Sequence, residues 1–141
     1  MPEKKTLERA RQDAREGKAP STQAGEFVRE EIEHVREGKH GARSPKQAIA
    51  IGLSKARRAG VKLPPPKKGR VSEKTLTQAE RDSEKGRKNP AAKPSAKRSR
   101  ATETALKREG HSAASPKALS QHAKQAARAR KKRGPVTRSK A

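Results

Sequence analysis

The chain has 141 residues, with 38 Lys and Arg against 15 Asp and Glu, and therefore a formal net charge of +23. Only 28% of the residues are hydrophobic and 1% are aromatic, well below the roughly 45–50% apolar content of a typical soluble domain. This composition excludes one compact domain of this length. It also leaves no run of about 20 apolar residues for a membrane span and no cysteine for a disulfide or a thiolate metal site.

The charge is concentrated toward the C-terminus. Residues 1–66 contain 15 Lys and Arg and 9 Asp and Glu, a net charge of +6, whereas residues 67–141 contain 23 and 6, a net charge of +17. Most of the large apolar residues lie in the first part, so we expect any small core there. The predicted regions are a small helical region (1–63), a Pro/Lys-rich disordered linker (64–100) and a basic helical or disordered tail (101–141).

Three helices are predicted in the first region. The first covers about residues 7–17 and ends at a glycine. The second covers about residues 21–38 and has the clearest amphipathic pattern in the chain. Its apolar residues, at i, i+3 and i+4 spacing, are Ala24, Phe27, Val28, Ile32 and Val35.

The third helix has clear start and stop signals. Ser44 is a suitable N-cap, Pro45 suits the first helical position and Gln47 completes a capping box. Gly60 is placed to end the helix. The alternation of residues 49–53 also fits a short strand, but the caps favour a helix. Its expected apolar face consists of Ile49, Leu53 and Ala56.

Two helices are predicted in the tail. A short one covers residues 102–109, and a longer one starts after Ser115 and covers 116–133. The longer helix carries seven Lys and Arg and no acidic residue. An isolated helix of this length is marginal in water, so we expect it to be only partly formed in the free protein. The expected fold class is therefore mostly α, with short helices, a marginal N-terminal helical region and a largely disordered basic tail.

A short sequence motif, the repeated phrase of this chain, recurs at three predicted helix junctions. Segments 15–21, 36–46 and 108–117 each contain Arg-Glu-Gly followed by a short loop and a serine. Each is consistent with a helix that ends at glycine and a new helix that begins at a serine N-cap. Such capping residues recur in any helical protein. The sequence therefore leaves open whether the second and third copies arose by duplication.

The segment 38–56, GKHGARSPKQAIAIGLSKA, resembles the core of a family of small basic bacterial proteins. That family has no assigned function and carries a Lys-Gln-Ala-Ile-Ala-Ile-Gly/Ala-Leu-Ser motif. The resemblance covers roughly residues 26–66, and it implies a bacterial source but no reaction. The Lys-, Ala- and Pro-rich tail resembles bacterial histone-like and nucleoid proteins in composition only.

The charge favours nucleic-acid binding, because Lys and Arg neutralise phosphates without needing a defined fold. The only Phe, Tyr or Trp is Phe27, which we expect in the core, so stacking on unpaired bases is not available. This favours non-sequence-specific binding of duplex DNA, as in nucleoid-associated or histone-like proteins. The predicted contact residues are Lys67, Lys68, Arg70, Lys97, Arg98, Arg100, Lys124, Arg128, Arg130, Lys131, Lys132 and Arg133.

Two alternatives use the same charges. In one, the protein is an RNA- or ribosome-associated basic protein. In the other, it is a non-enzymatic adaptor whose acidic helix pairs with basic segments of its own chain or of a second copy, giving a homo-oligomer. A solvated acidic face is the simpler interpretation. The glutamates of that face are Glu26, Glu30, Glu31, Glu33 and Glu37.

The sequence does not favour catalysis, metal binding or a membrane partner. The Ser-Pro-Lys motifs at 44–46 and 115–117 are similar to those of histone tails, but N-capping is the preferred role. No nucleophile elbow or phosphate-binding loop is visible, so we expect no enzyme, no cofactor and no small-molecule substrate. No secretory signal is visible, because no apolar segment follows the charged N-terminus. Together with the expected DNA binding, this predicts a cytoplasmic protein of the bacterial nucleoid with no membrane partner. We expect no metal site, because the histidines are scattered without carboxylate partners: His34, His40, His111 and His122.

Overall fold

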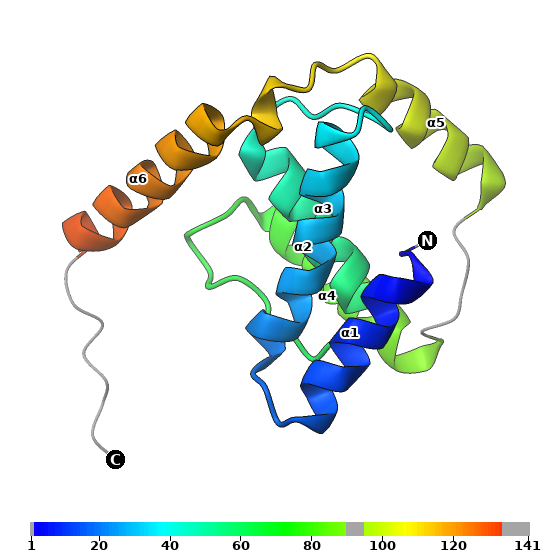
Figure 1. The fold of residues 1–141 in the computed structure, drawn as a ribbon. Coiled ribbons are helices and arrows are strands. Elements are labelled where there is room, and N and C mark those ends of the chain that lie inside the picture. The colour runs from blue at the N-terminus through cyan, green and yellow to red at the C-terminus, as the bar shows by residue number, and fades with distance from the viewer. Residues whose placement is uncertain (1, 90–94, 134–141) are drawn as a thin grey trace.

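The computed structural model describes residues 2–89 and 95–133, which contain six α-helices and a short 3₁₀ helix. No helix in these two ranges is both long and apolar enough to cross a membrane. The predicted mostly α fold is confirmed, and residues 49–53 are helical. In chain order the helices are α1 (Lys4–Arg15), α2 (Pro20–Arg36), α3 (Pro45–Arg58), α4 (Glu73–Lys88), α5 (Ala96–Lys107), the 3₁₀ helix η1 (Ser112–Ala114) and α6 (Pro116–Arg133) (Figure 1).

Several helix ends follow the capping residues that the sequence indicates, but the expected start of the second helix at Ser21 is wrong, because α2 begins at Pro20 after Ala19 and has no side-chain cap. Gly17, Gly38 and Gly60 have φ angles of 72°, 77° and 99°, in the left-handed region that favours glycine. At the start of α3, Ser44 Oγ accepts a hydrogen bond from the Gln47 backbone N–H at 3.3 Å. Ser115 Oγ accepts one from the backbone N–H three residues later, at 3.1 Å. N-capping by both Ser-Pro-Lys motifs is therefore confirmed.

Helix α2 lies at the centre of the N-terminal bundle, with α1 and α3 packed against it and α4 packed against α3 (Figure 1). Phe27 on α2 is 1% exposed, as the amphipathic pattern predicts. The buried residues around it are small, which keeps the helices close together. They are Ala10, Ala24, Ala56 and Val61.

Helices α2 and α3 approach each other at a glycine. A Cβ atom on Gly52 would lie 2.6 Å from the Val28 Cα atom, so the two backbones could not pack this closely around a larger residue. The predicted apolar face of α3 is displaced by one position because of this contact. The buried residues that form the contact stripe are Ala48, Gly52 and Ala56, whereas Ile49 and Leu53 are half-buried.

The structure differs from the sequence prediction in the segment 64–100, which we expected to be a disordered linker. Helix α4 lies there, begins at the N-cap Ser72 and packs against α3. Its Asp82 is 1% exposed and accepts hydrogen bonds from Ser54 Oγ at 2.7 Å and Arg58 Nε at 2.8 Å. Because α4 is attached mainly through polar contacts, hydrophobic periodicity did not reveal it.

The second and third copies of the repeated phrase contact each other. The backbone N–H of Gly41 donates to the Leu106 carbonyl at 2.8 Å, and that of Ala42 donates to the Gly110 carbonyl at 3.0 Å. A Cβ atom on Gly41 would lie 1.9 Å from the Glu109 carbonyl oxygen. We call this contact the repeat joint. Beside it lies a second buried cluster, formed by Val35, Ala42, Ala48, Ala113 and Ala114.

The tail is more ordered than the sequence predicts. Ala113 and Ala114 contribute to the core cluster beside the repeat joint, so the core is not confined to the N-terminal part. Helix α6 packs against η1 and α3 through half-buried residues near its start, among them Leu119 and His122. Helix α5 packs against no other described helix and contains no buried residue. The tail beyond residue 133 lies outside the described residues.

Two glycine substitutions test the close approach of α2 and α3. We expect Gly52→Ala to lower the free energy of unfolding by about 1–3 kcal/mol, because the added methyl group overlaps the backbone of α2. Gly25→Ala is the matched control, since nothing lies within 4 Å of its Cβ position. It should raise the free energy of unfolding by about 0.5–1 kcal/mol through helix propensity. Chemical denaturation of the full chain measures both, and stabilisation by Gly52→Ala would contradict the packing.

Candidate functional site

The predicted nucleic-acid contact residues fall on three separate elements. Figure 1 places α5 and α6 on opposite sides of the bundle, so these residues do not form one continuous patch. The first group lies in an exposed turn before α4, the second in the first two turns of α5, and the third on α6. The three groups are Lys67, Lys68 and Arg70; Lys97, Arg98 and Arg100; and Lys124, Arg128, Arg130, Lys131, Lys132 and Arg133.

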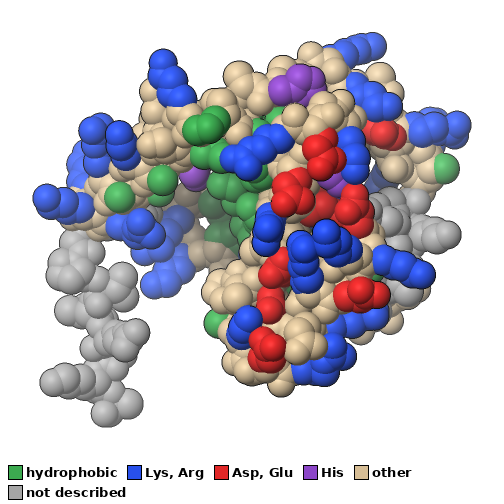
Figure 2. Space-filling view, in the orientation of Figure 1, with side chains coloured by type: hydrophobic (Ala, Val, Ile, Leu, Met, Phe, Trp, Pro, Cys, Tyr) green, Lys and Arg blue, Asp and Glu red, His purple; other side chains and the backbone are tan. Residues whose placement is uncertain are grey.

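Helix α6 presents the most regular of these groups. At 1.5 Å rise per residue, a helix brings positions i, i+7, i+11 and i+14 onto one face over about 21 Å. Lysine or arginine occupies all four positions, and every one of these side chains is exposed. Figure 2 shows the Lys and Arg side chains spread along this helix, with no acidic side chain beside them in that view. The four residues are Lys117, Lys124, Arg128 and Lys131.

The described cations of α6 make none of the ion pairs that several cations of the N-terminal bundle make. In the bundle, Arg58 pairs with Asp82 at 2.8 Å, and Arg29 pairs with Glu33 at 3.2 Å. Across the part of the chain that the structure describes, no ion pair involves a cation of α6, of the first two turns of α5 or of the 67–70 turn. The side chain of Arg133 lies outside that description. The other predicted contact residues are thus among the described cations without an ion pair, as are Lys4, Lys5 and Arg11 of α1, and α6 differs from α1 in that it carries no acidic residue.

A second site, which the sequence did not indicate, lies at the C-terminal end of α2. Glu31 is 0% exposed and lies between α2 and α3. Its Oε1 atom pairs with Lys55 Nζ, and its Oε2 atom is 3.1 Å from His40 Nε2. The His34 ring lies edge-on to the His40 ring, with 5.7 Å between centroids. We call Glu31, His34, His40 and Lys55 the Glu31 cluster.

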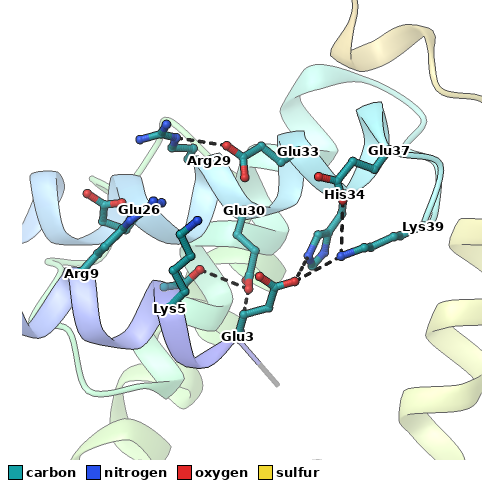
Figure 3. Close-up of a pocket in the computed structure, with 11 residues that line it drawn as sticks. Glu3, Lys5, Arg9, Glu26, Arg29, Glu30, Glu33, His34, Glu37 and Lys39 are labelled. Carbon is teal, nitrogen blue, oxygen red and sulfur yellow. Dashed lines mark hydrogen bonds and ion pairs between the residues drawn. The ribbon is translucent and has the colours of Figure 1, made fainter.

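A neighbouring network ties α1 to the same end of α2. Figure 3 shows Glu3 pointing from the start of α1 toward His34 and Lys39. Glu3 Oε1 is 3.0 Å from His34 Nε2 and 3.3 Å from Lys39 Nζ. The hydrogen bond with His34, together with Lys39, holds the pKa of the Glu3 carboxyl below its usual value. Glu30 is 3% exposed and accepts a hydrogen bond from the Glu3 backbone N–H at 2.6 Å.

These contacts correct two sequence-based expectations. The acidic face of α2 is not simply solvated, because Glu30 and Glu31 are buried against α1 and α3. The histidines are also not all without carboxylate partners, since His34 and His40 both lie beside Glu31. The i, i+3 spacing of Glu31 and His34 placed both on one face of α2 and was the available signal. The position of His40 depends on the turn at Gly38 and was not visible in the sequence.

The comparisons with known proteins bear on the N-terminal part of the chain. Residues 4–68 match a family described as a family of unknown function (DUF6496). This confirms the resemblance of the Lys-Gln-Ala-Ile-Ala-Ile-Gly-Leu-Ser segment to an uncharacterised family. It also extends the similarity from residues 26–66 to include α1. No curated protein and no solved structure matched the chain. The family description supplies no activity.

Removing Lys55 tests the buried charge of Glu31. In Lys55→Met the carboxylate remains buried without its ammonium partner, so we expect a loss of about 3 kcal/mol in the free energy of unfolding. The double variant Glu31→Gln with Lys55→Met should recover much of this loss, because no charge is then left buried. Lys107→Met removes an exposed pair with Glu103 and should change stability by less than about 0.5 kcal/mol.

Urea denaturation of the four full-length proteins measures these differences. Equal losses in Lys55→Met and in the double variant would show that the charge of Glu31 is not the cause.

Proposed function

We propose that the protein binds duplex nucleic acid without sequence preference, mainly through α6. The observation that carries the proposal is the row of exposed, unpaired cations on α6, with no acidic residue on that helix. Such a surface neutralises phosphates and releases condensed counterions, which requires no base recognition. The turn at 67–70 and the start of α5 would add further phosphate contacts. Duplex DNA of a bacterial nucleoid in the cytoplasm is the partner we propose first.

The position of the only Phe, Tyr or Trp supports a duplex over an unpaired strand. Proteins that bind single strands stack bases on aromatic side chains. In this chain Phe27 is buried between α1, α2 and α3 and is not available for stacking. Contacts to the phosphate backbone are therefore the main interaction that this surface offers.

The burial of the α2 glutamates weakens the adaptor alternative. Glu30 and Glu31 already contact α1 and α3, so two of the five glutamates of the acidic face are not free to bind basic segments of the tail or of a second copy. An RNA- or ribosome-associated role uses the same phosphate contacts. It is distinguished from DNA binding by direct competition between the two nucleic acids.

Neutralising α6 tests the proposal. We expect the variant with Arg128, Arg130, Lys131 and Lys132 changed to Gln to bind a mixed-sequence DNA duplex more weakly than the wild-type chain. At about −0.9 per phosphate contact, the slope of log K against log salt should become shallower by up to about 3.6. Fluorescence anisotropy over a salt series measures this slope. Two duplexes of unrelated sequence, a single strand and an RNA duplex complete the comparison.

The matched control removes the same charge from α1. Lys4, Lys5, Arg11 and Arg15 are exposed there, and changing them to Gln should alter the slope by less than about 1. Equal losses in both variants would indicate a response to net charge alone. Binding that does not depend on salt would contradict the phosphate model.

The helix content of the tail in the free protein can also be tested. We propose that the distal turns of α6 and helix α5, which are exposed, are only partly helical in the free protein. Phosphate contacts would reduce the repulsion among their cations and stabilise the helix. Far-UV circular dichroism should then show increased helix content on addition of duplex DNA. An unchanged spectrum at saturating duplex would contradict this prediction.

A further inference from the structure

We propose that Glu31, His34 and His40 form a binding site for one divalent transition-metal ion. One ligand atom from each side chain lies within 4.8 Å of those of the other two. Ligands bound at about 2.0–2.1 Å in a tetrahedral zinc site lie about 3.3 Å from one another, and Glu31 Oε2 is 3.1 Å from His40 Nε2. Two imidazoles and one carboxylate form a donor set that zinc uses in proteins.

An unsatisfied buried atom is the independent observation behind the proposal. Glu31 Oε2 is buried and has no hydrogen-bond partner in the described part of the chain, although His40 Nε2 lies close to it. Buried carboxylate oxygens are normally hydrogen-bonded or bound to a cation. A metal ion at this point would satisfy Oε2 without displacing Lys55, which pairs with the other oxygen, Oε1.

A hydrogen bond to the neighbouring backbone orients the ring of His40. Its Nδ1 atom is 2.9 Å from the Gly41 carbonyl oxygen, so an Nδ1–H donates to that carbonyl. In a neutral imidazole this leaves the lone pair on Nε2, the atom that faces Glu31. Metal-bound histidines commonly donate their second ring N–H to a carbonyl in this way, and the contact fixes the orientation of the ring.

The site would be structural. Glu31 and His34 lie one turn apart on α2, and His40 lies in the loop that leads to α3. A bound ion would therefore link the end of α2 to the residues just before Gly41 and Ala42, which form the repeat joint. This proposal concerns the N-terminal bundle and does not depend on nucleic-acid binding by α6.

Zinc titration of the metal-free, full-length protein tests the site. We expect one Zn²⁺ per chain by isothermal titration calorimetry, with affinity reduced at least about tenfold in His34→Gln, His40→Gln and Glu31→Gln. The matched control is His122→Gln on α6, which should bind Zn²⁺ as the wild type does. No binding by the wild-type chain would overturn the proposal. So would unchanged affinity in His34→Gln and His40→Gln, or a loss confined to His122→Gln.

A measurement on the wild-type chain avoids any folding defect of these variants. In ¹⁵N-labelled protein, one equivalent of Zn²⁺ should shift the ring-nitrogen signals of His34 and His40 and leave those of His122 in place. Shifts of all these histidines together would indicate adventitious binding to surface imidazoles and would overturn the site. In a separate metal-free sample, one equivalent of Co²⁺ should give the visible absorption of a four- or five-coordinate ion, and a purely six-coordinate aqua spectrum would also contradict the site.

Discussion

Buried carboxylates position the helices of this protein, because its apolar side chains are too few and too small to do so alone. Glu31 on α2 and Asp82 on α4 are 0% and 1% exposed, and each contacts α3, the first through Lys55 and the second through Ser54 and Arg58. A carboxylate removed from water requires cations or hydrogen-bond donors at defined places. These contacts therefore fix α2 and α4 on α3 more specifically than alanine packing would. The cost of an unpaired carboxylate makes this arrangement sensitive to the loss of a single cation.

The parts of the fold that sequence could predict are those encoded by local geometry. Helix ends depend on a residue's own φ angle and on side chains within three or four positions, so Gly38, Gly60 and Ser44 marked them correctly. Helix α4 and the Glu31 cluster could not be predicted in this way. Asp82 gives no hydrophobic period, and Glu31 looks like a solvated residue until Lys55 and His40, 24 and 9 positions away, are placed beside it.

The two parts of the chain differ in net charge, and they also differ in whether acidic residues lie near the Lys and Arg side chains. In the N-terminal bundle several acidic residues pair with nearby cations, either within one helix or turn or between elements, so opposite charges lie close together there. On α6 there is no carboxylate to cancel the cations, and their field extends into solvent over about a Debye length, roughly 8–10 Å. Under the proposed function, this division would favour α6 over the bundle as the surface that meets a phosphate backbone, although the bundle contains many Lys and Arg residues. Helix α1 carries Glu8 and Asp13 among its cations, whereas α6 carries no acidic residue, and for this reason the α1 cations form a suitable control for those of α6.

The loop 39–43 contacts both the N-terminal bundle and the segment 106–110 that leads to η1 and α6. His40 points back to Glu31, while the next two residues, Gly41 and Ala42, donate hydrogen bonds to the carbonyls of Leu106 and Gly110. The absence of a side chain on Gly41 lets the two copies of the repeated phrase meet backbone to backbone. Anything that fixes His40 must therefore also restrict Gly41, one peptide unit away, and with it the segment that leads through η1 to α6. Helix α6 also packs directly on η1 and α3, so the loop 39–43 is one of several contacts that join the basic helix to the bundle.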